Sequence, residues 1–157
     1  MSKATFVYFR IMITPYNDEY FMQKALEEAQ KAFDADEIPV GAVVVANDQI
    51  IARAHNFTEK LNDVTAHAEM QAITAAANFL GGKYLKGCTM YITLEPCVMC
   101  AGALYWSQID KIVFAASDEK RGAGVVGELY HPKTAIVRGI LEDEGKELMV
   151  KFFQKKR

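Results

Sequence analysis

Cysteine, proline and tryptophan are scarce in this sequence: its 157 residues include three cysteines, four prolines and one tryptophan. An odd number of cysteines, two of them in a Cys-x-x-Cys motif, does not provide a framework of disulfide pairs. This usage favours metal binding or redox chemistry in a reducing compartment, and we therefore expect a cytoplasmic protein.

Long apolar runs and a charge excess are also absent. Arg10 interrupts the apolar residues of segment 1–13, so this segment fits neither a signal peptide nor a membrane span, and we expect no membrane partner. The net charge of −2 provides no general attraction to nucleic acid, which local patches would have to bind. The composition, 51% hydrophobic and 24% charged, is typical of one globular domain with a core.

The pattern of apolar residues predicts an α/β protein with one mixed sheet. Apolar residues recur at helical spacing in segment 19–35, for which Asp18 is a suitable N-cap. Segments 41–46 and 49–54 flank a turn at Asn47-Asp48 and predict a hairpin of two strands. Further along, the sequence predicts helices at 66–79, 97–107 and 143–157, and strands at 88–94, 111–116 and 135–141. The strand, helix and strand within 88–116 indicate a parallel crossover.

Two short motifs carry the groups of a catalytic zinc site with a proton carrier. The first, Thr65-Ala66-His67-Ala68-Glu69, provides an imidazole and a carboxylate at the start of a predicted helix that Thr65 caps. The second, Leu94-Glu95-Pro96-Cys97-Val98-Met99-Cys100, provides two thiols at i and i+3. These thiols face one side of a helical turn, for whose start Pro96 is well suited.

If the two helix N-termini converge, His67, Cys97 and Cys100 occupy three corners of a zinc tetrahedron and leave the fourth for water. Two thiolates neutralise the charge of Zn²⁺, so a base is needed nearby, and Glu69 is the candidate. Residues i and i+2 of a regular helix point about 160° apart, so His67 and Glu69 can share a site only at a helix end.

Other interpretations of these motifs remain open. Cys-x-x-Cys alone also occurs in redox pairs and in structural zinc sites. A redox pair leaves the upstream His-x-Glu without a role, and a structural site needs a fourth ligand, for which Cys88, His55 and His131 are the candidates. Cys88 begins a predicted strand and is more typical of a buried small apolar residue. The two motifs together favour the catalytic site.

The order His-x-Glu followed by Pro-Cys-x-x-Cys is the signature of zinc-dependent nucleobase deaminases. From Tyr20 to its C-terminus the chain resembles the bacterial tRNA-specific adenosine deaminases, within the cytidine and deoxycytidylate deaminase superfamily. Beyond the two motifs, the resemblance rests on Ile38-Pro39-Val40-Gly41-Ala42-Val43, Asn56, Ala101-Gly102-Ala103, Gly139-Ile140-Leu141 and Phe152-Phe153.

This resemblance implies a three-layer α/β/α cytidine-deaminase-like fold with a five-stranded mixed sheet, one Zn²⁺ per subunit and a homodimer. Residues 18–157 are expected to form a single zinc-dependent deaminase domain, after a poorly ordered N-terminal extension at 1–17. The implied reaction converts the wobble adenosine of a tRNA anticodon stem-loop to inosine and releases ammonia, with Glu69 transferring the protons. The implied substrate contacts are Asn56, Ala68, Pro96 and Asp118.

Some residues depart from the family pattern and leave the substrate open. Val64 stands where the family usually has proline, segment 124–133 is short, and Tyr105-Trp106 resembles the related guanine deaminases. A deaminase of free nucleobases or nucleosides is therefore the alternative. A non-catalytic zinc or RNA-binding domain is a further one, in which Glu69 would have no role.

Local basic and aromatic residues are the candidates for RNA contact. They are Lys120 and Arg121, which follow Asp118, and the C-terminal Phe152, Phe153, Lys155, Lys156 and Arg157. Basic residues near aromatic rings hold phosphates and stack bases. A terminal helix with an apolar stripe and lysines on its solvated face has the same pattern. In the same way, Asn56 suits a surface turn and Asp118 suits a loop cap.

Overall fold

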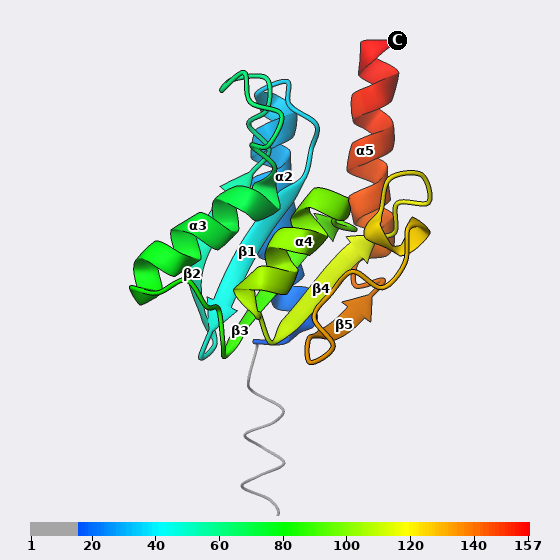
Figure 1. The fold of residues 1–157 in the computed structure, drawn as a ribbon. Coiled ribbons are helices and arrows are strands. Elements are labelled where there is room, and N and C mark those ends of the chain that lie inside the picture. The colour runs from blue at the N-terminus through cyan, green and yellow to red at the C-terminus, as the bar shows by residue number, and fades with distance from the viewer. Residues whose placement is uncertain (1–15) are drawn as a thin grey trace, which may run out of the picture.

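A five-stranded mixed sheet forms the middle layer of the structure, with helices on both of its faces (Figure 1). The computed structural model describes residues 16–157. The strands are β1 (Gly41–Ala46), β2 (Gln49–His55), β3 (Cys88–Leu94), β4 (Lys111–Ala116) and β5 (Ala135–Arg138). The helices are α2 (Asp18–Asp34), α3 (Ala68–Leu80), α4 (Val98–Ser107) and α5 (Glu142–Lys156), with a short 3₁₀ helix, η1, at Ala123–Val125.

The direction of the strands determines where the connecting loops gather. The strand order is β2-β1-β3-β4-β5. Strand β1 is antiparallel to both β2 and β3, while β3, β4 and β5 are parallel to one another. Strands β2, β3 and β4 therefore run in one direction, and the segments that follow them all begin at the same edge of the sheet. Ligands of open α/β sheets bind at such an edge.

Each face of the sheet has its own apolar core. On one face, small residues of α3 (Ala68, Ala72 and Ala76) and Leu104 of α4 pack on alternate strand residues, among them Val44, Met90, Ile92, Ile112 and Phe114. On the other face, α2 packs on the intervening residues, including Val43, Tyr91 and Val113. Figure 1 shows α3 and α4 on the near face and α2 behind the sheet. The alternation follows from the two-residue period of a strand, and it confirms the expected three-layer α/β/α arrangement.

Gly41 allows α2 to lie unusually close to β1. A Cβ atom at this position would be 2.1 Å from the carbonyl oxygen of Ala25 and 2.3 Å from the backbone nitrogen of Ala29. Both atoms belong to the backbone of α2, so a side chain at position 41 would have to displace the helix itself. The glycine thereby fixes how closely the helix and the sheet approach each other.

The predicted elements are all present, but three helix starts differ from the prediction. The N-cap of α2 is Asn17, whose side chain accepts a hydrogen bond from the backbone N–H of Tyr20, and not Asp18. Helix α3 begins at Ala68 with His67 as its N-cap, so Thr65 does not cap it. Instead, the backbone N–H and hydroxyl of Thr65 donate to the side chain of Asp63 at 2.8 and 2.7 Å. Pro96 likewise precedes α4, whose N-cap is Cys97.

The sequence predicted a poorly ordered N-terminal extension and no membrane span. The predicted extension at residues 1–17 lies almost entirely outside the described residues. Within residues 16–157, no helix combines the length and the apolar character needed to cross a membrane.

Candidate metal centre and active site

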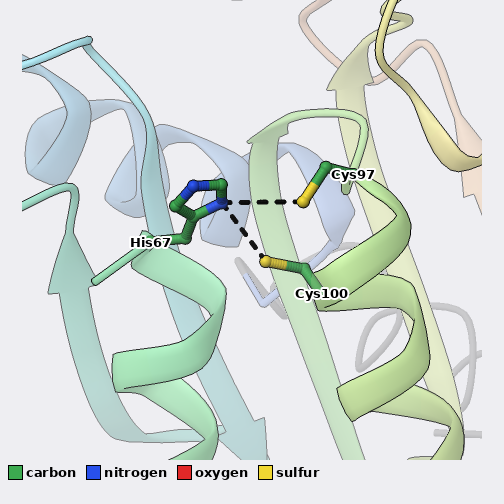
Figure 2. Close-up of side chains that lie close together, drawn as sticks. All are labelled: His67, Cys97 and Cys100. Atoms are coloured by element: carbon green, nitrogen blue, oxygen red, sulfur yellow. Dashed lines mark hydrogen bonds between the residues drawn. The ribbon is translucent and has the colours of Figure 1, made fainter. Parts of the chain in front are cut away.

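Two helix N-termini present the candidate metal ligands at the common edge of the sheet. His67 is the N-cap of α3 and has an extended backbone, with φ −70° and ψ 155°. Cys97 is the N-cap of α4, also extended, and Cys100 lies in the first turn of that helix. Neither N-cap side chain forms a capping hydrogen bond, so both are free to point toward each other (Figure 2).

The distances between the three side chains fit a zinc ion. The Nδ1 atom of His67 lies 3.6 Å from Sγ of Cys97 and 3.5 Å from Sγ of Cys100 (Figure 2). Zinc bonds of about 2.3 Å to sulfur and about 2.0 Å to nitrogen, at tetrahedral angles, separate nitrogen and sulfur by about 3.5 Å. The three ligand atoms all lie within 4.8 Å of one another. The spatial relation of these side chains therefore suits tetrahedral coordination.

The cluster contains three protein ligands, and the candidates for a fourth have other partners. Nδ1 of His55 lies 3.3 Å from the carboxylate of Glu28. Nδ1 of His131 accepts a hydrogen bond from the backbone N–H of Lys133, and Cys88 is buried in the core on the α3 and α4 face. Within residues 16–157, His67, Cys97 and Cys100 form the only group of three or more potential ligands. Three protein ligands with one open position are characteristic of a catalytic rather than a structural zinc.

The pKa values of the two cysteines in the cluster are shifted in opposite directions. A hydrogen bond from the thiol of Cys100, aided by His67, lowers the pKa of Cys97 to about 4. The same interaction and burial raise the pKa of Cys100. Cys97 is therefore a thiolate at neutral pH, and the thiolate in turn raises the pKa of His67. A thiolate at a helix N-terminus is also favoured by the helix dipole, and it is the form that binds metal.

Glu69 lies in the first turn of α3, two residues after His67, and its side chain is buried. Because His67 is outside the regular helix, the two side chains avoid the opposite orientations that i and i+2 have within one. Burial raises the pKa of Glu69, against a smaller lowering by a hydrogen bond from Cys100. A carboxyl group with a raised pKa is suited to accept and release a proton near neutral pH.

Residues 15–116 match the model of the cytidine and deoxycytidylate deaminase zinc-binding region. The chain belongs to this deaminase family. It is 47% identical to the tRNA-specific adenosine deaminase of Aquifex aeolicus over 88% of this chain and 95% of the relative. A solved structure from a study of A-to-I editing by tRNA deaminases at the wobble position is 41% identical, with a TM-score of 0.77, over 82% of this chain and 98% of that chain.

A second group of relatives acts on a free base. The solved guanine deaminase of Nitrosomonas europaea is 28% identical to this chain, with a TM-score of 0.77, and the match covers 88% of this chain and 84% of that one. The fold is therefore shared by deaminases of both substrate types. The guanine deaminase of Bacillus subtilis is 41% identical to this chain, with a TM-score of 0.62, over 64% of this chain and 65% of that one. The tRNA-specific relatives differ from it in matching a larger share of this chain.

Asn56 is held beside this deaminase site by a buried acid that the sequence analysis did not identify. The side chain of Glu37, 1% exposed, accepts hydrogen bonds from the backbone N–H groups of Lys60 (2.7 Å) and Glu59 (3.2 Å). It also accepts one from Nδ2 of Asn56 at 3.4 Å. The Oδ1 atom of Asn56 is buried and has no hydrogen-bond partner among the described residues. The carboxylate thus fixes the amide so that its acceptor oxygen is left available.

A second buried acid, Glu95, anchors the loop that follows β4. Its carboxylate accepts hydrogen bonds from the backbone N–H groups of Gly124 (2.9 Å) and Asp118 (3.3 Å). A Cβ atom on Gly122 would be 2.5 Å from this carboxylate, so the loop approaches closely only because residue 122 is glycine. Gly122 also forms an isolated bridge with Cys97. Glu95 therefore holds loop 117–124 against the start of α4. The sequence does not reveal these contacts, because Glu95 binds backbone N–H groups and Glu37 binds backbone N–H groups together with the side chains of Asn56 and Thr58.

The other predicted substrate contacts lie along these same segments. Ala68 is buried at the start of α3, and Pro96 is buried between β3 and α4, where its carbonyl oxygen accepts from the N–H of Ala123. The side chain of Asp118 accepts from the backbone N–H groups of Lys120 and Arg121 at 3.1 and 3.0 Å. Asp118 therefore caps a turn that holds both basic residues on the anchored loop.

The C-terminal basic and aromatic residues divide into buried and exposed groups. Phe152 is 4% exposed and packs edge-on against Phe33, which argues against its predicted base stacking. Phe153 is exposed. Lys155 and Lys156 lie 3.8 and 2.6 Å from the carboxylate of Asp36, and the terminal Arg157 is exposed.

The lowered pKa of Cys97 predicts selective alkylation of this residue in the metal-free protein. Above about pH 4 the Cys97 thiol is ionised, so iodoacetamide at pH 6 should modify it and should react more slowly as the pH approaches 4. Cys88 should stay unmodified, because it is buried and burial raises its pKa. Peptide mass spectrometry measures both sites. Zinc loading should protect Cys97, and equal labelling of Cys88 and Cys97 at pH 6 would contradict the assignment.

Proposed function

We propose that this protein is a zinc-dependent cytoplasmic deaminase that converts the wobble adenosine of a tRNA anticodon to inosine and releases ammonia. The observation that carries the proposal is a three-ligand metal centre beside a buried carboxylate, in a chain whose similar relatives are tRNA-specific adenosine deaminases. The anticodon stem-loop of tRNA is the proposed partner. The proposed chemistry, the substrate contacts and the homodimer are each supported by a different part of the structure.

The proposed chemistry divides between the metal ligands and Glu69. His67, Cys97 and Cys100 would hold Zn²⁺, which supplies the Lewis acidity that activates a water molecule. Glu69 accepts a proton from the attacking water and delivers it to a ring nitrogen of adenine. The oxygen of this water forms a bond to C6 of adenine. Glu69 then takes the remaining proton from that oxygen and transfers it to the amino group, so the C6–N bond breaks, ammonia leaves and a C6 carbonyl remains. The burial that raises the pKa of Glu69 supports both steps, because the group both accepts and releases a proton.

Two of the proposed nucleoside contacts use groups that have no hydrogen-bond partner among residues 16–157. The Oδ1 atom of Asn56 is a buried free acceptor, and such an orphaned atom is uncommon in proteins. We assign it to a donor on the target nucleoside. Ala68 is the first residue of α3, so its backbone N–H has no helical partner and can donate to the base. Pro96 and Asp118 border the same edge on the other side of the metal centre.

The proposed RNA contacts beyond the target nucleoside lie on two segments. Loop 117–124 carries Lys120 and Arg121 next to the start of α4. At the end of α5, Phe153 and Lys156 line a groove together with Glu59 and Lys60 of the loop that follows Asn56. Lys155, Lys156 and Arg157 would bind phosphates there, with the two lysines exchanging the carboxylate of Asp36 for RNA. Both segments lie at the same edge of the sheet as the metal centre.

The proposed homodimer uses the outer face of α4. Val98, Gly102, Tyr105 and Trp106 follow the i, i+4, i+7 and i+8 spacing of one helical stripe. Trp106 is 76% exposed, and a Cβ atom on Gly102 would have no neighbour within 4 Å. Val125 and Val126 of the neighbouring loop are also exposed. An apolar stripe with a glycine in its middle allows two copies of α4 to pack closely around a two-fold axis.

Replacement of Glu69 by glutamine should reduce turnover by about 10²- to 10⁴-fold, because the amide cannot transfer the proton. Zinc content should stay at one ion per chain, because Glu69 is not a ligand. Glu19→Gln is the matched control, since Glu19 is exposed on α2, on the other face of the sheet, and should leave turnover unchanged. Inosine formation and metal analysis measure the two properties. Near-normal turnover of the Glu69→Gln protein would rule out the proposed role.

The substrate should be an RNA, and salt dependence tests this. The pure protein is incubated in parallel with an anticodon stem-loop, guanine, adenosine and cytidine, and ammonia is measured. If four phosphates are bound, raising the salt from 50 to 200 mM should lower kcat/KM for the stem-loop by about 50-fold, at a slope of about −0.7 per phosphate. Activity on guanine alone, with little salt dependence, would favour the guanine deaminase alternative. A zinc-loaded protein that releases ammonia from none of them would be a non-catalytic domain.

Trp106→Glu should convert the protein from a dimer to a monomer, because it places a charge within the proposed apolar interface. Sedimentation should give twice the chain mass of 17.5 kDa for the unmodified protein and the single mass for the variant. Val150→Glu is the control, because Val150 is exposed on α5, away from α4. An unmodified protein that sediments as a monomer at micromolar concentration would refute this interface.

A further inference from the structure

The side chain of Gln71 joins three backbone carbonyl groups near the metal centre. Its Nε2 atom lies 2.7 Å from the carbonyl oxygen of His55, 3.1 Å from that of Ala66 and 3.3 Å from that of His67. An amide nitrogen has two hydrogens, so it shares them among the three acceptors. The metal centre as described above makes no use of this side chain.

The three carbonyl groups belong to the two ends of one loop. His55 is the last residue of β2 and directly precedes Asn56, whereas Ala66 and His67 end the loop and begin α3. The N–H of Phe57 also donates to the carbonyl oxygen of Ala66 at 3.0 Å. Gln71 thus holds the segment that carries Asn56 against the segment that carries the metal ligand His67.

Apart from the backbone bond between Phe57 and Ala66, the connection between the two loop ends depends on Gln71. Glu37 binds Asn56, Thr58, Glu59 and Lys60, which lie in the first part of the loop. Asp63 binds Thr65 within the loop itself. Neither acid connects the end of β2 with the start of α3. Among the side-chain hydrogen bonds of the described residues, those of Gln71 link His55 to Ala66 and His67.

We infer that Gln71 is a positioning residue that sets the distance between Asn56 and the metal centre during deamination. The inference rests on the proposed function, because it assumes that Asn56 binds the target nucleoside. A nucleoside held by Asn56 reaches the metal centre in the reactive geometry only if the two loop ends keep their spacing. A displacement of about 1 Å in such an arrangement can reduce the rate about 10²-fold.

The first test is Gln71→Met, which keeps the length and apolar bulk of the side chain but removes the donor. With the anticodon stem-loop as substrate, kcat should fall at least tenfold, while KM should change less than threefold, because phosphate contacts dominate RNA affinity. Zinc content should stay at one ion per chain. Thr74→Ala on the solvent side of the same helix is the control and should leave both constants unchanged. An unchanged kcat for Gln71→Met would overturn the inference.

A double-mutant cycle with Asn56→Ala separates positioning from general stability. If Gln71 acts through Asn56, Gln71→Met should lower the single-turnover rate at least tenfold in the original protein and less than twofold in the Asn56→Ala protein. An excess of enzyme and long incubation keep slow rates measurable. An equal decrease in both backgrounds would show that Gln71 only stabilises the fold, and would overturn the inference.

Hydrogen exchange of the zinc-loaded protein provides a result that does not depend on activity. In Gln71→Met, amides of residues 55–67 should exchange at least tenfold faster, while those of β3 should exchange as before. Unchanged exchange in 55–67 would overturn the inference even if activity fell. If the unmodified protein does not deaminate the stem-loop, the proposed function fails, whereas the exchange result still shows whether Gln71 holds the loop ends together.

Discussion

The convergence of two helix N-termini at one edge of the sheet is the constraint on which the site depends. Strand β1 is antiparallel to both of its neighbours, so β2 and β3 end at the same edge and the segments after them begin α3 and α4 side by side. The N-terminal partial positive charges of both helices therefore point at one place. That field favours a thiolate at a helix N-terminus, and it acts in the same direction as the hydrogen bonds from Cys100 and His67 that lower the pKa of Cys97. Sheet topology thus places the candidate ligands where the helix dipoles also favour a thiolate.

Two buried carboxylates hold the loops on either side of this centre. Glu37 lies under the loop after β2, and Glu95 lies under the loop after β4, and both accept hydrogen bonds from backbone N–H groups. A buried carboxylate is costly unless such donors surround it. Loops tied in this way can carry substrate contacts with the precision of a regular element. The two acids are therefore part of the site although neither borders the metal ligands as a reacting group.

The sequence predicted the chemistry of the site better than its local geometry. His67, Cys97 and Cys100 are recognisable because zinc ligands are restricted to few residue types at fixed spacings. Thr65 was expected to cap α3, but the hydroxyl is bound by Asp63, and the imidazole of His67 stands at the cap position instead. A capping pattern does not show which of two nearby residues takes the position, since both have suitable neighbours.

Contacts with distant backbone groups were beyond prediction. Gln71 and Glu37 interact mainly with carbonyl or N–H groups, which every residue has, so no residue type in the partner segment reveals the pairing. The alternation of apolar residues did predict the order of strands and helices, because burial on a sheet face depends on residue type at a fixed period. Residue types therefore predicted the features that require particular side chains, such as the metal ligands and the buried apolar faces. They did not predict contacts in which the partner is a backbone group.

The cap positions of α3 and α4 have a consequence for the life of the protein in a cell. Each helix begins with a metal ligand that forms no capping hydrogen bond, where serine or aspartate would ordinarily secure the first turn. The ion that these ligands hold thereby also fastens the first turns of both helices. During zinc shortage, the first turns of these two helices would be less stable in newly made chains. Cellular proteases cut such poorly ordered segments most readily. Zinc supply would then control the abundance of the protein as well as its chemistry.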